Sequence, residues 1–241
     1  MGINNVPTVT RAQMIEIDRR MIAYYGISLL QMMENAGRNL ALLSCDMLGG
    51  TLQNKRVAVL CGGGNNGGGG MTAARHISNW GGDVQVSLAV PQSALKGAAA
   101  HQIHILSAMG LSITDEYPVG DFDLIIDALI GYGLHGTPRG IFARWIDFTN
   151  NSEGPILSLD IPSGLDVDTC RASGACVRAH TTLTLALPKA GMLTKGAQEF
   201  LGRLFLGDIS VPPALLREMG LEMQDFIFTS SIMEIPRNWF V

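Results

Sequence analysis

A glycine-rich stretch at residues 62–70 constrains this chain more than any other feature. Seven of its nine residues are glycine, and the two exceptions are Asn65 and Asn66. The apolar run at residues 57–60 precedes it and a helical pattern follows it, which predicts a strand, a loop and a helix in that order. Glycine allows a ligand to approach the backbone closely. Because a loop that opens a helix presents free N–H groups, we expect this stretch to bind an anion or a polar ligand rather than to pack.

Further along the chain, apolar runs alternate with helical patterns, which indicates an α/β fold. Expected strands are 57–61, 84–90, 123–129, 155–160, 181–187 and 204–209, the last being the final strand, and expected helices are 10–25, 28–48, 70–80, 92–109 and 141–150. Strands that are apolar throughout are typical of a mostly parallel sheet covered by helices on both faces. We therefore expect one α/β domain over residues 1–241, preceded by two N-terminal helices and closed by an irregular tail that docks on the domain.

Composition excludes several classes of function. The net charge of −4 does not suggest a face for nucleic acid. No run of 18 apolar residues occurs, and the first residues lack the pattern of a signal peptide, so we expect neither a membrane span nor secretion. The four cysteines form no CxxC pair, which argues against a zinc or redox site and is typical of buried thiols in a reducing cytoplasm.

Polar residues follow three of the predicted strands. Asp127 and Asp160 each end an apolar run, as Asn66 does after the first strand, and Ser163 lies in the turn after Asp160. Ligands of open parallel sheets bind outside the carboxyl ends of the strands, so we expect these side chains in one crevice. Oxygen ligands with a single full charge suit a weakly held hard cation, and a plain hydrogen-bond network is the alternative.

The sequence does not match two common nucleotide-binding motifs. The glycine spacing matches the dinucleotide-binding fingerprint formally, but Pro91 and Gln92 stand where its acidic residue belongs. No lysine follows the loop as in a Walker phosphate loop. We expect His101 and His104 to be a surface pair, Asp166 and Asp168 to serve as turn and capping groups, and Lys189 and Lys195 to be solvated.

Five ordered motifs resemble the NAD(P)H-hydrate epimerase family, whose module is the YjeF N-terminal domain. They are Val9–Met14, Gln31–Arg38, the glycine-rich stretch, Asp127–Leu134 and Asp160–Asp166, and the segment 207–212 is also similar. The resemblance covers residues 9–213 and leaves 214–241 as a C-terminal tail.

The resemblance implies a Rossmann-like three-layer α/β/α sandwich, a homodimer in the cytoplasm, and epimerisation of the hydrated cofactors NADHX and NADPHX at C6. It implies Asp160 as the catalytic acid/base, which also contacts the substrate, and one K⁺ per subunit on Asn66, Asp127 and Ser163. The remaining substrate-binding residues that it implies are Asn65, Asn66, Gly67, Gly68, Gly69, Gly131, Tyr132, Gly133, Leu134, His135, Gly136 and Thr137.

One position departs from the family pattern. The family loop reads Asn-Asn-Gly-Gly-Asp-Gly, and Gly69 stands here in place of its aspartate. Two functions therefore stay open at this point: an active epimerase, or a catalytically impaired member that serves as a nucleotide-binding or protein-interaction module.

Overall fold

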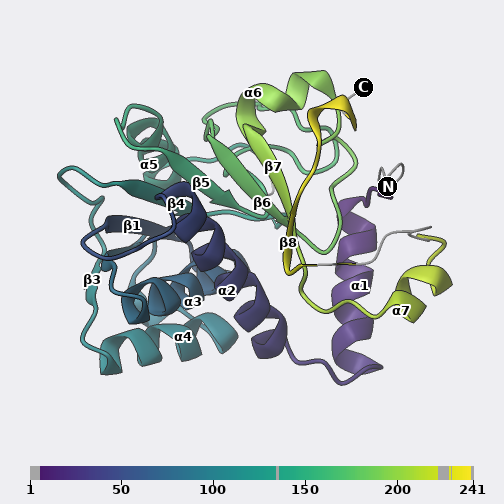
Figure 1. Ribbon diagram of the computed structural model, residues 1–241, viewed down its shortest axis with the longest axis horizontal. Helices are drawn as coiled ribbons and strands as arrows, with labels where there is room; N and C mark the ends of the chain where they lie inside the picture. Colours follow the sequence, from purple (N-terminus) through teal and green to yellow (C-terminus); the bar gives the residue numbers. More distant parts are fainter. Residues whose placement is uncertain (1–5, 134–135, 222–227, 229, 240–241) are drawn as a thin grey trace.

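The computed structural model describes residues 6–133, 136–221, 228 and 230–239. In this part of the chain one eight-stranded sheet runs in the order β3-β2-β1-β4-β5-β6-β7-β8 (Figure 1). All neighbouring strands are parallel except the antiparallel pair β7 and β8, so the expected α/β class is confirmed. The strands are β1 Arg56–Cys61, β2 Asp83–Leu88, β3 Ser112–Thr114, β4 Leu124–Ala128, β5 Ile156–Leu159, β6 Thr181–Leu185, β7 Arg203–Gly207 and β8 Ile232–Glu234.

Two capped helices precede the sheet, as expected. They are α1 Arg11–Ala23 and α2 Leu29–Met47. Thr10 and Ser28 are their N-caps, and in both a glutamine three residues later completes a capping box. The mid-helix Gly37 marks a close approach of α2 to α3, because a Cβ at this position would lie 2.4 Å from the Cβ of Thr72.

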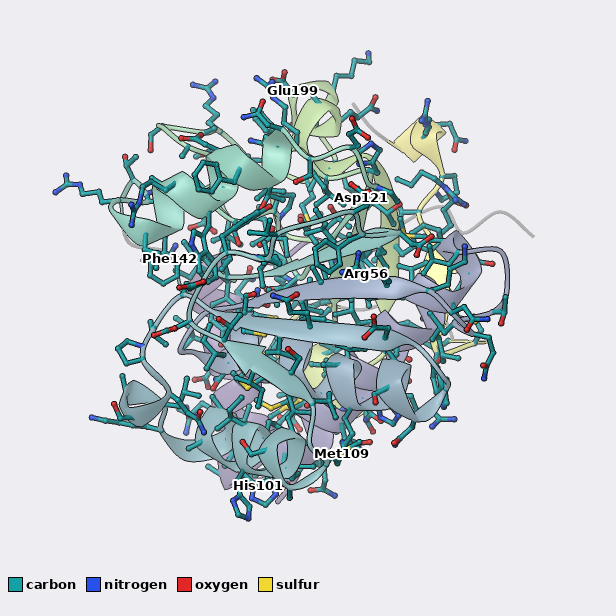
Figure 2. All side chains as sticks on the ribbon, turned by 90° about the vertical axis from the view of Figure 1, so that its left-hand side faces the viewer. Arg56, His101, Met109, Asp121, Phe142 and Glu199 are labelled. Carbon is teal, nitrogen blue, oxygen red and sulfur yellow. The ribbon has the colours of Figure 1, made fainter. Side chains whose placement is uncertain are left out.

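Helices cover both faces of the sheet. α2, α3 (Asn65–Asn79) and α4 (Gly97–Ala108) lie on one side, and α5 (Ile141–Asn150) lies on the other (Figure 2). Among the described residues, no helix is both long and apolar enough to span a bilayer. The remaining elements are α6 Gln198–Leu201, α7 Pro213–Glu218 and the 3₁₀ turns Gln92–Ala94, Lys195–Ala197 and Arg237–Trp239.

The sequence pattern did not predict the two edge strands. β3 and β8 have three residues each and lack the apolar run of a buried strand. The expectation that 204–209 is the final strand is therefore wrong, because β8 pairs with β7 after it. The tail docks on the sheet through β8, while residues 240–241 lie outside the described residues. The expected helix over 92–109 is also split into a 3₁₀ turn and α4.

The glycine-rich stretch is a packing element, contrary to our expectation. α3 begins at Asn65 rather than near residue 70, so Gly67–Gly70 form its first turns, and all four are buried. A Cβ at Gly67 would lie 2.0 Å from the carbonyl oxygen of Gly62, and one at Gly70 would lie 2.6 Å from the Cβ of Ala128. The glycines therefore let the start of α3 lie directly against β1 and β4.

Candidate active site

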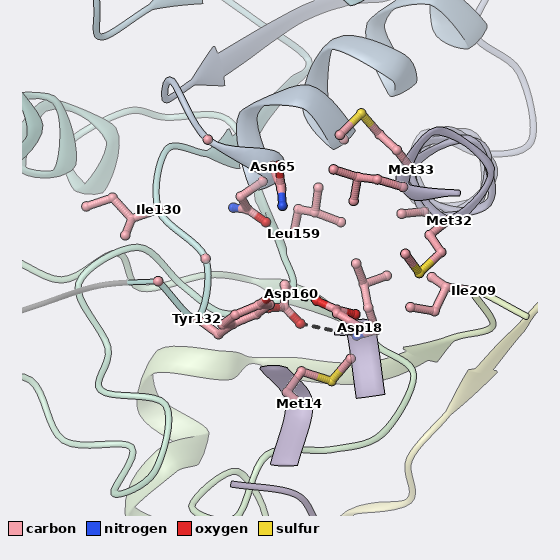
Figure 3. A pocket seen from close by; sticks show the side chains of 18 of the residues that line it. Met14, Asp18, Met32, Met33, Asn65, Ile130, Tyr132, Leu159, Asp160 and Ile209 are labelled. Atoms are coloured by element: carbon pink, nitrogen blue, oxygen red, sulfur yellow. Dashed lines mark hydrogen bonds between the residues drawn. The ribbon is translucent and has the colours of Figure 1, made fainter. Parts of the chain in front are cut away.

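A cavity of about 390 Å³ opens at the carboxyl ends of the central strands (Figure 3). Its walls come from the segments that follow β1, β4 and β5, from the ends of β6 and β7, and from α1 and α2. The sheet order reverses between β1 and β4, which is where open α/β sheets bind ligands. The expected crevice thus exists.

The structure places most of the sequence-predicted substrate residues at this cavity. Those that line it are Asn65, Asn66, Gly69, Gly131, Tyr132, Gly133 and Asp160. Gly67 and Gly68 do not, because they pack beneath it against Gly62 and Met33. Gly136 and Thr137 also lie off its wall, and the Thr137 hydroxyl lies 3.0 Å from that of Ser173. Leu134 and His135 lie outside the described residues.

The N-terminus of α3 forms one wall of the cavity. Its N-cap is Gly64, and no side chain caps the helix. The first-turn N–H groups of a helix have no partner within the helix, and the helix dipole adds positive potential at this end. Asn65 and Asn66 bring amide side chains to the same wall. This wall therefore suits a phosphate or another anionic group.

Asp160 is held by a buried lysine. It lies just after β5 with φ of 66°, a left-handed conformation that aspartate tolerates better than most residues. Lys189 Nζ donates to Asp160 Oδ1, and also to Thr184 Oγ1 at 2.9 Å and to the carbonyl oxygen of Leu185 at 3.0 Å. The expectation of a solvated Lys189 is wrong, whereas Lys195 is exposed as expected.

The backbone of Val9 flanks Lys189 on both sides. Val9 N donates to the carbonyl oxygen of Pro188 at 2.9 Å, and Ala190 N donates to the carbonyl oxygen of Val9 at 2.9 Å. This isolated parallel bridge joins the residue before the cap of α1 to the turn after β6. It fixes the stem from which the lysine enters the cavity.

A second hydrogen-bonded pair lines the cavity, made of Asp18 on α1 and Tyr132 in the segment after β4. Tyr132 Oη donates to Asp18 Oδ2 at 2.5 Å. Burial raises the pKa of Asp18, and the charge of Asp160 raises it further, while the Tyr132 hydrogen bond and the charge of Lys189 act in the opposite direction. Burial and the two nearby acids also raise the pKa of Tyr132. Nothing in the sequence pattern distinguishes Asp18, because it lies among the polar residues of an amphipathic helix.

Of the three expected cation ligands, Asn66 lines the cavity, whereas Asp127 and Ser163 do not. Asp127 is fully buried and accepts from the Ser163 hydroxyl at 2.5 Å, from Ser163 N at 2.8 Å and from the Ser158 hydroxyl at 2.8 Å. Burial raises the pKa of Asp127, and these hydrogen bonds counter part of that effect. Asn66 lies against Gly131, and its buried Nδ2 has no hydrogen-bond partner among the described residues. The structure brings Asp127 and Ser163 together in a buried hydrogen-bond network, not in the crevice where the strand-end rule expected them.

Two pairs of residues lie outside the cavity, as expected. Asp168 Oδ1 accepts from Arg11 N at 2.7 Å at the start of α1, and Asp166 Oδ1 accepts from Thr169 N at 2.9 Å. His101 and His104 are exposed on α4, and His101 points outward in Figure 2. None of these residues contributes to the cavity wall.

Comparison with known proteins decides the family. The family model described as the YjeF-related protein N-terminus matches residues 29–191, which is more than half of the chain. The chain belongs to the YjeF-related N-terminal family. A family relative from Dehalogenimonas lykanthroporepellens, named NAD(P)H-hydrate epimerase, is 42% identical over 90% of this chain and 87% of its own length.

Other YjeF-related proteins are longer. The relative from Moorella thermoacetica, named bifunctional NAD(P)H-hydrate repair enzyme Nnr, is 35% identical over 86% of this chain, and the match spans only 41% of that protein. The crystal structure of the yeast protein ynu0 superimposes with a TM-score of 0.82 and covers 95% of this chain and 99% of its own. At 24% identity, that likeness supports the fold alone.

Proposed function

We propose that this protein interconverts the R and S epimers of the hydrated nicotinamide cofactors NADHX and NADPHX. The observation that carries the proposal is the Asp160–Lys189 pair, which lies in a cavity whose wall is the N-terminus of α3. The cavity thus combines an acid/base group with an anion-binding helix start. The names of the stand-alone relatives supply the substrate class.

Each part of the cavity has a distinct task in this proposal. The first-turn amides of α3, with Asn65 and Asn66, would hold the phosphates of the nucleotide. Gly131–Gly133 would contact the ring and the sugar, because glycine lets the backbone approach closely. Asp160 would exchange a proton with the C6 hydroxyl, and Lys189 would hold the carboxylate in place. Two routes are open: the lone pair of the ring nitrogen assists loss of water from C6, or the C6 oxygen forms C=O and expels the ring nitrogen. In both routes, return to the other face inverts C6.

We further propose one K⁺ per subunit on Asn66, Asp127 and Ser163. The donor set is made of oxygen atoms, as a hard monovalent cation requires. The Ser163 hydroxyl lies within reach of a second acceptor, the carbonyl oxygen of Ile130 at 3.2 Å, so it can turn away from Asp127 and free a carboxylate lone pair. The unpartnered amide end of Asn66 can likewise present its oxygen after a flip. The bound ion would supply positive charge beneath the loop after β4.

Two broader properties belong to the same proposal. We propose a homodimer, which is supported by the face of α1 where Ile15 and Ile22 remain 50% and 47% exposed at a spacing of seven residues. Sedimentation equilibrium tests this state. We also propose a cytoplasmic location, supported by the four cysteines, which are all free thiols. Fractionation of cells that express the tagged protein tests the location.

The direct test follows isolated R and S hydrates by NMR, with and without K⁺. We expect interconversion well above the spontaneous rate. Asp160→Asn should lower kcat by about 10²-fold or more, because it removes the proton acceptor, and should leave binding within about threefold. Asparagine also tolerates the left-handed conformation at this position. If the wild-type protein gives only the spontaneous rate but still binds the hydrate, the alternative of a non-catalytic binding module replaces the enzyme.

A further inference from the structure

Two carboxyl groups enter the cavity from different elements. Asp160 lies after β5 and Asp18 lies on α1, and both line the same cavity wall with Tyr132 and Lys189 (Figure 3). These four are the ionisable side chains among the described residues that line it. Their proximity is electrostatically significant, since the charge of Asp160 acts on both Asp18 and Tyr132.

The two carboxyl groups have opposite surroundings. Asp160 contacts an ammonium group directly, which stabilises a carboxylate and suits a base. Asp18 contacts a neutral phenol through Oδ2, and no described residue hydrogen-bonds to its Oδ1. Burial raises the pKa of Asp18, which favours a protonated acid. Pairs of titratable groups with divergent environments are typical of a general acid and a general base.

We propose that Asp18 is a second catalytic residue, which protonates the ring nitrogen N1 of the hydrate while Asp160 removes the proton of the C6 hydroxyl. This inference rests on the proposed epimerase function and specifies its chemistry as ring opening. Asp18 accepts the Tyr132 hydroxyl on Oδ2, and Oδ1, to which no described residue hydrogen-bonds, would carry the transferred proton.

The steps balance without any further reactant. Asp160 takes the hydroxyl proton, the oxygen forms a C=O bond to C6, the C6–N1 bond breaks, and N1 takes the proton of Asp18. Rotation about C5–C6 turns the other face of the aldehyde toward N1. N1 then attacks C6 and returns its proton to Asp18, and the C6 oxygen takes the proton back from Asp160. Both residues regain their initial protonation states in each turnover.

The alternative route, loss and return of water, leaves the same two groups in the wrong protonation states after one turnover. The acid would protonate the departing hydroxyl, and the base would take a proton from the returning water. Asp18 would end as a carboxylate and Asp160 as an acid, so both would need a further proton exchange before the next turnover. The observed pairing of Asp160 with Lys189 and of Asp18 with Tyr132 therefore favours ring opening.

The first test compares Asp18→Asn with Glu16→Gln on the same helix. Glu16 is paired with Arg19 and Arg20 away from the cavity and serves as a matched control. With R and S hydrates we expect Asp18→Asn to lower kcat by about 10²-fold with KM within about threefold, and Glu16→Gln to match the wild type. If the wild type is active and the kcat of Asp18→Asn lies within threefold of it, the catalytic role of Asp18 is overturned but the epimerase function is not. An inactive wild type would instead overturn the proposed function.

A second test does not need Asp18 to be changed. Asp18 must be protonated to act, so kcat should fall as the pH rises through its pKa. Burial and the charge of Asp160 raise this pKa, and the charge of Lys189 and the hydrogen bond of Tyr132 lower it. Tyr132→Phe removes the hydrogen bond that lowers this pKa, so the high-pH limb should move to higher pH. An unmoved limb would contradict the assignment.

Isotope exchange separates the two routes. Ring opening keeps the original oxygen on C6, whereas loss of water replaces it with solvent oxygen. In ¹⁸O-labelled water we expect epimerisation to run ahead of label incorporation, as observed by mass spectrometry. Incorporation at the rate of epimerisation would rule out proton transfer from Asp18 to N1.

Discussion

Lys189 Nζ donates a hydrogen bond to Asp160 Oδ1, and the two side chains are shielded from solvent, with relative exposures of 1% and 6%. A buried ion pair is weak evidence for net stability, but the loss of one partner leaves an uncompensated buried charge. This contact therefore links the proposed acid/base chemistry of the cavity to the integrity of the fold.

Lys189→Met tests this link. We expect a loss of about 3–5 kcal/mol in the free energy of unfolding, because the carboxylate of Asp160 stays buried without its partner. Epimerase activity should fall together with stability. Urea denaturation and the R/S assay measure the two effects. Lys195→Met, at an exposed lysine, is the control and should change neither.

Asp18 predicts an unusual dependence of stability on pH. Its pKa is raised in the folded protein, so its folded form binds the proton more tightly. The stability it contributes is fully present below the unfolded pKa of about 3.9 and is lost as the pH rises through the folded pKa. Asp18→Asn should therefore gain stability relative to the wild type over that pH range, measured by urea denaturation at successive pH values.

Glu16 on the same helix provides a control of opposite sign. Hydrogen bonds from Arg19 and Arg20 lower its pKa to about 2. Its contribution is present above the unfolded pKa and is lost as the pH falls toward 2. The difference between Glu16→Gln and the wild type should thus shrink toward acid pH. If the free energies of unfolding of the two variants, each taken relative to the wild type, change in the same direction with pH, the opposite pKa shifts of Asp18 and Glu16 are contradicted.

Substitutions at different positions of the glycine-rich stretch should differ sharply in how much they lower the free energy of unfolding. A Cβ at Gly67 would lie 2.0 Å from the Gly62 carbonyl oxygen, and the Gly62 backbone is held by the hydrogen bond from its N–H to the carbonyl oxygen of Ala128 at 3.1 Å. Gly67→Ala should cost about 3 kcal/mol. At Gly69 the atom in the way is the side-chain terminus Leu159 Cδ2 at 2.7 Å, which can rotate away. Gly69→Asp should stay within about 1 kcal/mol of the wild type, because an acid near a helix N-terminus is favourable.

The same Gly69→Asp variant reports on catalysis. Gly69 lines the cavity, so the new carboxylate would enter it at the position where the resemblance implies an aspartate. We expect epimerisation to be at least as fast as in the wild type. Thermal unfolding establishes that the variant is folded, and the R/S assay gives the rate. A folded variant with a rate tenfold lower would show that this chain requires the glycine.

Potassium should stabilise the wild-type protein through Ser163 and Asp127. A ligand of the folded state at tenfold excess over its dissociation constant adds about 1.4 kcal/mol. The midpoint temperature of thermal unfolding should therefore be higher in KCl than in an equal concentration of LiCl. Ser163→Ala removes a ligand but keeps the backbone N–H bond to Asp127, and should abolish the difference. A persistent difference in Ser163→Ala would place the ion elsewhere.

The alternation of strands and helices, together with the strand-end rule, was enough to predict the class of fold, although Asp127 and Ser163 lie outside the cavity lining where the rule expected them. It was also enough to place Asp160 in the cavity. Lys189 could have been found by the same rule, since it follows Pro188 at the end of a predicted strand. Its charge led to the opposite expectation, because lysines are rarely buried unless paired, and the pairing acid lies far away in sequence.

Asp18 and the glycine-rich stretch show what the pattern could not reveal. Asp18 has the spacing of a solvent-facing helical residue, and only the docking of α1 beside the loop after β4 brings it to Tyr132. Glycine has low helix propensity, so Gly67–Gly70 indicated a loop. Tertiary packing overrides that propensity, because only glycine allows α3 to lie so close to Gly62 and Ala128.

The bridge that Val9 makes to Pro188 and Ala190 has a consequence for how the protein matures. During synthesis, the start of α1 leaves the ribosome long before the turn after β6 does. The ammonium partner of Asp160 cannot be in place until the chain has closed a loop that includes most of the sheet. Contacts of such long sequence separation form slowly. We therefore expect a nascent chain to have its glycine-rich stretch early and the contact of Asp160 with Lys189 only at the end.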